Sequence, residues 1–329
     1  MASLRDKLRP GKLLTAPGVF DGISLRLADR MGFECLYMTG YGTVASHLGL
    51  PDAGLASYRD MVERVRTFAG LATTPLFADG DTGYGGLLNV EHTVRGYEAA
   101  GAAAIQLEDQ EFPKKCGHTP GRRVIPIEQA AAKIKVAAES RDSRDFLIVA
   151  RTDARTAHGL DEALRRAEAF AEAGADVLFV ESPETVEEME KIGRSFDLPL
   201  LVNVVEGGKT PVLSAEEYIS LGYQIAIFPA VGFLDLFGPF AGAMGGRRHP
   251  VDGLADLGGR GALLLDGGGD LGGDLVERAD RRADLSDRVD RGPGLTLDAV
   301  DERLDLVGRL AGLLRQGLHL GGDHREALA

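Results

Sequence analysis

Eight short apolar runs alternate with amphipathic segments between residue 13 and about residue 233, and this alternation limits the possible folds more than any other feature. An open doubly wound sheet would carry a glycine-rich phosphate loop after its first strand, and none is present. The alternation therefore predicts an α/β protein of the closed (β/α)8 barrel type. The predicted strands are Leu13–Ala16, Cys35–Met38, Pro75–Ala78, Ala103–Leu107, Phe146–Ala150, Val177–Val180, Pro199–Val202 and Ile225–Phe228.

Apolar residues at three- and four-residue spacing predict helices between these strands. In the helix predicted over Leu160–Ala173, the charges are expected on the face opposite the apolar residues. A further helix begins after Thr185, because Glu188 three residues later completes a capping pattern. The other predicted helices include Ser57–Phe68, Val90–Ala100, Ile127–Ala138 and Ser214–Leu221.

Charge and cysteine content restrict the partners and the compartment. The net charge of −13 argues against nucleic acid or an anionic membrane as partner, but it allows a small anionic substrate. The two cysteines, Cys35 and Cys116, make no disulfide framework. The N-terminus has no apolar signal core, and no later run approaches a membrane span. We therefore expect a soluble cytoplasmic protein.

Polar residues directly follow six of the predicted strands. A solvated strand end would explain any one of them. Barrels of this type, however, build their sites from the loops at the C-terminal face, so six polar ends indicate one shared site. These residues are Thr39–Gly42, Asp79–Asp81, Glu108, Arg151–Asp153, Glu181 and Asn203.

Asp79, Asp81 and Glu108 supply hard oxygen ligands of the kind that suits Mg²⁺. The alternative is a turn in which Asp79 and Asp81 make only local hydrogen bonds. No set of histidines and cysteines has the spacing of a zinc site.

Cys116 directly follows two lysines, Lys114 and Lys115, in the segment Gln106–His118. Their charge is expected to lower the pKa of the thiol and make it reactive, whereas the alternative is a solvated basic loop with an incidental cysteine. Arg151 could clamp a carboxylate or phosphonate. A metal ion with an arginine indicates an α-oxyacid whose developing enolate is stabilised electrostatically, with Cys116 as acid or base at carbon.

Seven motifs, taken in order, resemble the isocitrate lyase / phosphoenolpyruvate mutase superfamily from residue 13 to about residue 233. They are Thr-Gly-Tyr-Gly at 39–42, Leu-Gly-Leu-Pro-Asp at 48–52, Asp-Gly-Asp at 79–81, Leu-Glu-Asp-Gln at 107–110, Lys-Lys-Cys-Gly-His at 114–118, Ala-Arg-Thr-Asp-Ala at 150–154 and Val-Glu-Gly-Gly-Lys-Thr-Pro at 205–211. Each motif alone is modest, and only their order and spacing are specific.

The resemblance implies a magnesium enzyme whose cysteine loop closes over the site. The implied magnesium shell, formed largely through water, is Asp52, Asp79, Asp81 and Glu108. The implied catalytic residues are Cys116, Lys114, His118, Arg151 and Tyr41. Those implied to bind the substrate are Thr39, Gly40, Tyr41, Gly117, His118, Arg151, Glu181 and Asn203. The family is commonly tetrameric and often exchanges its last helix between subunits, so a homotetramer is expected if the true last helix is present.

The resemblance leaves the reaction open. Lys-Lys-Cys-Gly-His occurs in carbon–carbon lyases and also in carboxyphosphonoenolpyruvate phosphonomutase, which forms a phosphorus–carbon bond with decarboxylation in antibiotic biosynthesis. Residues 203–211 resemble the phosphonomutase and the alkylmalate-type lyases more than the tricarboxylate lyases, and the segments at 39–42 and 150–155 lean the same way. The phosphonomutase is our first expectation, by a narrow margin. The alternative is a lyase that acts on 2-methylisocitrate or an alkylmalate such as 2,3-dimethylmalate and releases pyruvate or a related keto acid. A second alternative is a catalytically silent barrel that binds a metabolite.

The composition changes abruptly at about residue 235. Twenty of the last 95 residues are glycine, and Lys, Ile, Tyr, Asn and Cys are absent. No motif of the family is found after Phe233. We therefore divide the chain into a barrel domain at 1–234 and an atypical low-complexity tail at 235–329.

The tail is either a natural flexible extension or, as we favour, the product of a shifted reading frame. Translating the underlying DNA in the other two frames tests this hypothesis, which fails if neither frame encodes a family-like helix.

Overall fold

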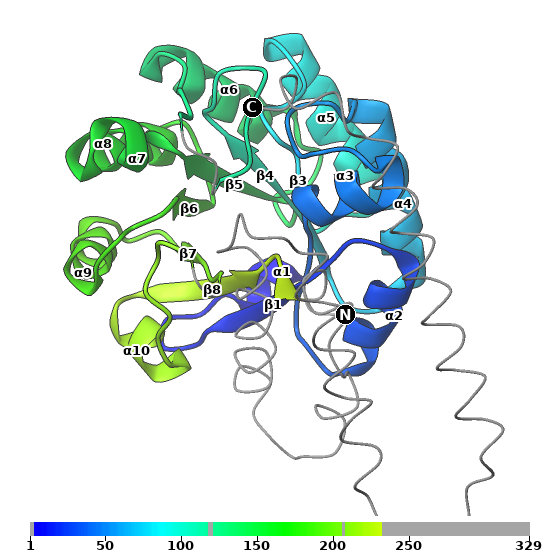
Figure 1. Ribbon diagram of the computed structural model, residues 1–329, viewed down its shortest axis with the longest axis horizontal. Coiled ribbons are helices and arrows are strands. Elements are labelled where there is room, and N and C mark those ends of the chain that lie inside the picture. Colours follow the sequence, from blue (N-terminus) through cyan, green and yellow to red (C-terminus); the bar gives the residue numbers. More distant parts are fainter. Residues whose placement is uncertain (1–2, 118–120, 206–207, 232–329) are drawn as a thin grey trace, which may run out of the picture. The chain divides into compact units, whose positions relative to one another are not determined.

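Eight parallel strands close into a barrel in the computed structural model, which describes residues 3–117, 121–205 and 208–231 (Figure 1). Each strand pairs with the next one in the sequence, and β8 pairs with β1 to close the barrel. The fold class predicted from the alternation is therefore confirmed. The strands are β1 (Leu14–Val19), β2 (Leu36–Met38), β3 (Leu76–Asp79), β4 (Ala104–Glu108), β5 (Leu147–Thr152), β6 (Val177–Val180), β7 (Leu200–Asn203) and β8 (Tyr223–Phe228).

Side chains along each strand alternate between the two faces of the barrel wall. One set fills the interior and includes Tyr37, Phe77 and Phe179, each 1–3% exposed. The residues between them, such as Leu36 and Leu178, pack against the helices. Because apolar side chains fill the interior, the polar residues of the site are confined to the mouth.

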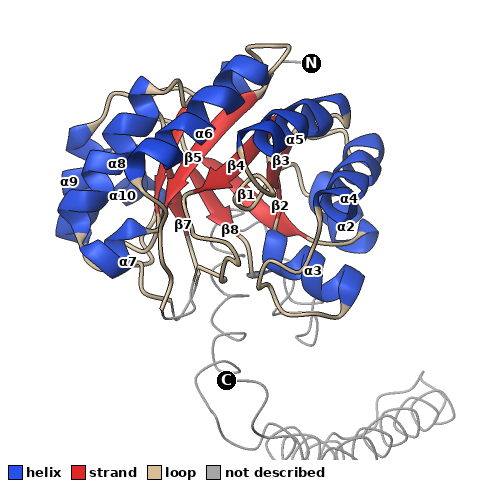
Figure 2. Cartoon of the chain, turned by 90° about the horizontal axis from the view of Figure 1, so that it is seen from above, coloured by secondary structure: helices blue, strands red, loops and turns tan. Residues whose placement is uncertain are grey.

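Helices surround the strands, as Figure 2 shows. Two of them, α3 (Gly40–Leu48) and α7 (Ala154–His158), begin directly after the carboxyl ends of β2 and β5 and therefore lie at the mouth. The other helices are α1 (Leu4–Lys7), α2 (Gly22–Arg30), α4 (Tyr58–Leu71), α5 (Leu87–Ala99), α6 (Ile127–Ser140), α8 (Leu160–Glu172), α9 (Val186–Ser195) and α10 (Ala215–Ser220).

Polar caps fix where several helices begin. The Thr185 side chain accepts a hydrogen bond from the backbone N–H of Glu188 at the start of α9, as the sequence predicts. Ser57 and Ser214 cap α4 and α10 through capping boxes. A cap of this kind contributes about 1 kcal/mol to helix stability.

All eight predicted strands are present, but several extend further at their carboxyl ends than predicted. Asp79, Glu108 and Asn203 are therefore the last residues of β3, β4 and β7 rather than the first residues of loops. The ladder of the barrel consequently fixes their backbone positions.

One prediction about a helix face is wrong. Arg166 is buried on the same face of α8 as Ala163 and Phe170, not on the charged face opposite them. This side chain has an ionic partner inside the protein, Asp109, which the spacing of charges along the helix could not reveal.

The tail at 235–329 lies outside the described residues, and the division at residue 234 stays a prediction. Among the helices that the structure describes, none is long and apolar enough to cross a membrane.

Candidate active site

Three carboxylates and one lysine crowd one part of the mouth, which we call the acidic side (Asp52, Asp79, Asp81 and Lys114). Asp79 ends β3, Asp81 lies two residues further on, and Asp52 comes from the loop before α4. The Lys114 Nζ atom lies 2.5 Å from Asp52 Oδ1 and 2.7 Å from Asp81 Oδ1. The side chain of Lys114 is only 3% exposed, so these ion pairs are shielded from water.

Burial and charge shift the pKa values on the acidic side. Burial raises the pKa of Asp81 to about 6; Lys114 opposes this rise, whereas Asp79 and Asp52 add to it. Burial opposes the charged form of Lys114, but Asp81 and Asp52 hold its pKa well above the usual value. Lys114 therefore remains an ammonium and is unsuited to act as a base. In the structure the Lys114 ammonium pairs with these carboxylates, and its predicted effect on the Cys116 thiol stays a prediction.

The loop after β3 is held in an unusual conformation. Asp81 has a left-handed φ of 48°, and Tyr84 has a φ of 58°. The Tyr97 hydroxyl of α5 donates to the Asp79 carbonyl at 3.1 Å and lies 3.0 Å from the Tyr84 hydroxyl. Asp79 also accepts a hydrogen bond from the Asp81 amide at 3.1 Å. The local turn considered as an alternative is thus present, but the Asp81 carboxylate points to Lys114.

The donor set at this end of the barrel suits a hard divalent cation. Asp79, Asp81 and Glu108 are each 5–6% exposed, and the Oε1 atom of Glu108 has no hydrogen-bond partner in the described structure. Burial raises the pKa of Glu108 well above its usual value; Arg151 opposes the rise, and Asp153 adds to it. A bound cation would relieve this crowding of negative charge.

The geometry also limits how a cation would bind. Within the described ranges, no three His, Cys, Asp or Glu side chains are already grouped as ligands of one ion. Lys114 pairs with Asp52 and Asp81, whereas Glu108 keeps one oxygen without a hydrogen-bond partner in the described structure. A shell completed largely by water, as the resemblance implies, fits this arrangement better than four direct ligands.

Two arginines share one aspartate on the opposite part of the mouth, which we call the guanidinium side (Arg122, Arg151, Asp153 and Glu181). Arg151 of β5 donates through Nε and Nη2 to the two carboxylate oxygens of Asp153, at 2.9 and 2.8 Å. Arg122, on the segment that returns from the cysteine loop, forms a short ion pair with the same carboxylate. Burial alone would raise the pKa of Asp153, but the two arginines lower it.

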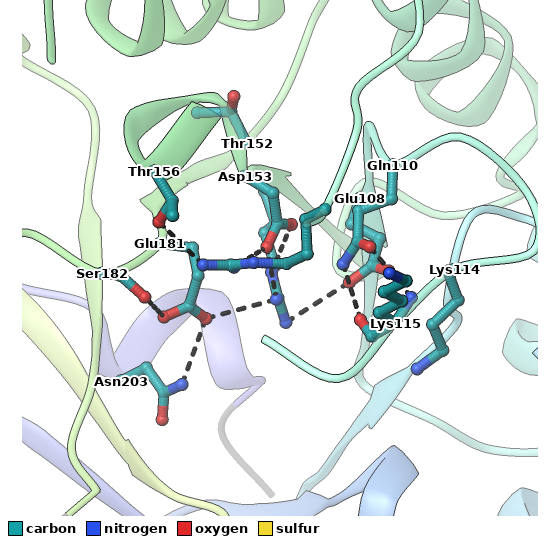
Figure 3. A network of polar contacts seen from close by, with 12 residues as sticks. Glu108, Gln110, Lys114, Lys115, Thr152, Asp153, Thr156, Glu181, Ser182 and Asn203 are labelled. Atoms are coloured by element: carbon teal, nitrogen blue, oxygen red, sulfur yellow. Dashed lines mark hydrogen bonds and ion pairs between the residues drawn. The ribbon is translucent and has the colours of Figure 1, made fainter. Parts of the chain in front are cut away.

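Arg151 also contacts two further carboxylates at the mouth. Its Nη1 lies 3.3 Å from Glu108, and its Nη2 lies 3.4 Å from Glu181 at the end of β6. Asn203 donates to Glu181 at 3.1 Å, and its own Oδ1 has no hydrogen-bond partner within the described chain. Figure 3 shows Glu181 and Asn203 on one side of this network and Glu108 on the other.

The first turn of α3 brings backbone amides to the same mouth. Thr39 caps this helix with its backbone, and the next two residues are Gly40 and Tyr41. A Cβ atom at Gly40 would lie only 2.5 Å from Asp79 Oδ2, so this glycine is required by the close approach of α3 to the acidic side. A helix N-terminus favours negative charge, and a substrate carboxylate would be stabilised there.

The cysteine loop is anchored over these groups. The side-chain amide of Gln110 makes two hydrogen bonds, of 2.9 and 3.0 Å, to the backbone of Lys115. Burial raises the pKa of Tyr41, and the charges of Cys116 and Asp52 raise it further. A Cβ atom at Gly117 would lie 2.6 Å from Arg151 Nη2. The structure therefore places Gly117, the residue after Cys116, against Arg151, whereas His118 lies outside the described residues.

Sequence reasoning missed the buried support behind Arg151. Asp109 accepts hydrogen bonds from the Thr152 hydroxyl at 2.8 Å, the Asp153 amide at 2.9 Å and Arg166 at 3.0 Å. An arginine within an apolar helix face was the available signal, because such a residue is rarely buried without a partner.

Comparisons with known proteins identify the family of this barrel. The family model described as phosphoenolpyruvate phosphomutase matches residues 4–232. The 2,3-dimethylmalate lyase of Eubacterium barkeri is 50% identical over 228 residues, which cover 69% of this chain and 79% of the relative. The chloroplastic carboxyvinyl-carboxyphosphonate phosphorylmutase of Arabidopsis thaliana is 40% identical over 221 residues, or 66% of this chain and 65% of that protein.

A solved structure supports the same assignment. A phosphonopyruvate hydrolase in complex with oxalate and Mg²⁺ superposes with a TM-score of 0.62 and 30% sequence identity, over 84% of this chain and 95% of that chain. The predicted resemblance is thereby confirmed over the barrel. The chain belongs to the phosphoenolpyruvate mutase / isocitrate lyase superfamily of mutases and oxo-acid lyases.

Proposed function

We propose that this chain is a magnesium-dependent carbon–carbon lyase that cleaves an alkylmalate of the 2,3-dimethylmalate kind into pyruvate and propionate. The observation that carries the proposal is the position of Gly117, directly after Cys116 in the chain, against the Arg151 guanidinium. A lyase needs a proton donor at the carbon atom that leaves, and a thiol beside the anion-binding groups can supply it.

The relatives support a lyase more than our first expectation, the phosphonomutase. Identity to the 2,3-dimethylmalate lyase is 50%, against 40% to the phosphorylmutase, over ranges of similar length. Both proteins belong to one superfamily, so the barrel does not separate the two reactions. We therefore place the lyase first and retain the phosphonomutase as the second candidate.

Substrate binding would use both sides of the mouth. The carboxylate next to the hydroxyl-bearing carbon would lie at the N-terminus of α3, near Gly40 and Tyr41. The other carboxylate would face Arg151, with Glu181 and Asn203 fixing the position of the guanidinium. Two separated anion sites match the two carboxylates of a malate.

Asp79, Asp81 and Glu108, with Asp52 further out, would hold Mg²⁺. When bound, the ion would supply electrostatic stabilisation of the negative charge that develops on the substrate oxygen. Lys114 would keep Asp52 and Asp81 in place as a permanent ammonium, because its pKa lies well above the usual value when these two carboxylates flank it.

The bond between C2 and C3 of the substrate would break while the C2 hydroxyl loses its proton and becomes the keto group of pyruvate. The electron pair of that bond passes to C3 and its carboxylate, forming the enolate form of propionate. Cys116 then donates its proton to C3, and the proton released from the hydroxyl restores the thiol through solvent. Arg151 would stabilise the enolate charge before protonation.

A coupled assay tests the proposal. Purified protein with Mg²⁺ is expected to release pyruvate from 2,3-dimethylmalate, and adding EDTA should abolish the release. Phosphorus NMR with carboxyphosphonoenolpyruvate should show no new phosphorus–carbon species; if one forms and no keto acid appears, the phosphonomutase is correct. Absence of both reactions would favour a silent metabolite-binding barrel.

A further inference from the structure

Arg122 and Arg123 are neighbours with opposite environments. The Arg122 side chain is 1% exposed and reaches Asp153, and its Nη2 donates to Thr156 Oγ1 of α7 at 2.8 Å. The Arg123 side chain is 78% exposed and pairs with Glu111 at the surface. Burying a guanidinium is costly unless charged partners compensate it, so the inward position of Arg122 calls for a reason.

The reason lies in what Asp153 does to Arg151. Asp153, Glu108 and Glu181 all lie within 3.4 Å of the Arg151 guanidinium. With three carboxylates around a single cation, Arg151 would have little attraction left for an incoming anion. Arg122 adds a second cation to the same aspartate and so compensates part of its charge.

Asp153 is held in place from behind. Its amide donates to Asp109 at 2.9 Å, and Asp109 is paired with the buried Arg166 of α8. The backbone of Asp153 is therefore fixed, and within the described residues its carboxylate is held only by Arg122 and Arg151. Because Arg122 and Arg151 bind the same carboxylate, a change at Arg122 alters the charge and the orientation of the group that Arg151 contacts.

We propose that Arg122 is a positioning residue that shares Asp153 with Arg151 and thereby leaves the Arg151 guanidinium oriented and free to bind the substrate carboxylate. The inference rests on the proposed function, since it takes Arg151 as the anion-binding group. Arg122 need not touch the substrate for this role.

Calorimetric titration of Mg²⁺-loaded protein with oxalate, a small dicarboxylate, tests the role without requiring turnover. Arg122→Gln is expected to weaken oxalate binding by about tenfold. Arg122→Lys keeps the charge but loses the Thr156 contact, so its oxalate affinity should lie between those of Arg122→Gln and wild type. Arg123→Gln is the matched control and should bind oxalate as wild type does. The Mg²⁺ affinity of all three variants should be unchanged.

Two results would overturn the inference. One is wild-type oxalate affinity in Arg122→Gln; the other is an equal loss of Mg²⁺ and oxalate binding, which would make the role merely structural. Failure of wild-type protein to release pyruvate from 2,3-dimethylmalate, with the oxalate results as expected, would reject the proposed substrate but not the role of Arg122. Failure of wild-type protein to bind oxalate would reject the anion site and both proposals with it.

Discussion

The acidic side and the guanidinium side of the mouth solve the burial of charge in opposite ways. On the acidic side, three carboxylates surround a single ammonium, and burial raises the pKa of Asp81 to about 6. On the guanidinium side, two arginines flank Asp153 and lower its pKa. The first arrangement is short of positive charge and suits a cation, while the second keeps an arginine available for an anion.

The difference teaches how one small mouth can bind both a metal ion and a dicarboxylate. Glu108 lies between the two sides, with one oxygen 3.3 Å from Arg151 and the other without a hydrogen-bond partner in the described structure. It therefore links the expected metal position to the expected anion position. The cysteine loop contributes Lys114 to the acidic side, and the segment that returns from it contributes Arg122 to the guanidinium side.

The largest effect is expected from the loop. Cys116→Ser should lower kcat by about 100- to 10,000-fold, because the proton donor is lost, while Mg²⁺ and oxalate affinities stay near wild type. Turnover assays and calorimetry together measure this. Cys35→Ala, at a buried cysteine in the barrel interior, is the control and should keep its turnover. Equal losses of binding and rate in Cys116→Ser would mean that the cysteine holds the two sides together.

A change on the acidic side should separate metal binding from anion binding. Asp81→Asn keeps the shape of the side chain and suits its left-handed backbone, but it removes one charge. We expect the Mg²⁺ affinity to fall by about 100-fold and turnover to fall with it. Oxalate binding measured without metal should be unchanged. An unaltered Mg²⁺ titration would remove Asp81 from the metal shell.

The support behind the guanidinium side predicts a pH effect on stability. Burial and the neighbouring Asp153 raise the pKa of Asp109 to about 6, against about 3.9 for an unfolded aspartate. Between these values the folded state holds a proton that the unfolded state has lost. Raising the pH from about 4 to about 6 should therefore lower the free energy of unfolding, on the order of 2–3 kcal/mol from this group.

Urea unfolding across this pH range, with EDTA present, measures how steeply the free energy of unfolding changes with pH. Asp109→Asn cannot titrate and should lose the Asp109 contribution. Asp161→Asn, at an exposed position on α8, should keep it. Identical slopes in wild type and Asp109→Asn would show that Asp109 does not change its protonation on folding.

The smallest effect is expected from the tyrosine behind the acidic side. Tyr97→Phe removes the hydrogen bond to the Asp79 carbonyl and should weaken Mg²⁺ binding by about two- to tenfold. Tyr218→Phe is matched to it, because Tyr218 also donates to a backbone carbonyl, that of Pro211, but it lies on α10 away from the carboxylates. A similar loss of Mg²⁺ affinity in both variants would indicate a general loss of rigidity rather than a role of Tyr97.

The sequence was sufficient for the barrel and for most of the residues at its mouth. Apolar runs such as Val177–Val180 reveal strands because burial on both faces leaves a local pattern. The polar residues that end the strands share the mouth because parallel strands all finish at one face. Position in the fold therefore followed from order along the chain.

Ionic pairing could not be predicted in the same way. Nothing near Lys114 in the sequence indicates that its ammonium lies between Asp52 and Asp81. The pairing of Arg166 with Asp109 likewise joins α8 to the end of β4. Such partners depend on the register of distant elements, which residue types alone do not encode.

The bridge that pairs Gln110 with Val124 has a consequence for how reactions change in this family. Hydrogen bonds from Glu111 to Arg123 and from Ile125 to Asp109 fasten the two ends of the cysteine loop to each other, independently of the residues between them. The segment between these ends carries Lys114 and Arg122, which pair with Asp81 and Asp153 at the mouth. Sequence changes around Cys116 can therefore alter the proton-transfer chemistry with little effect on the barrel, provided that both cations are kept. Exchanging the loop between relatives should leave the host's binding sites intact only where the incoming loop supplies a cation at each of these two positions.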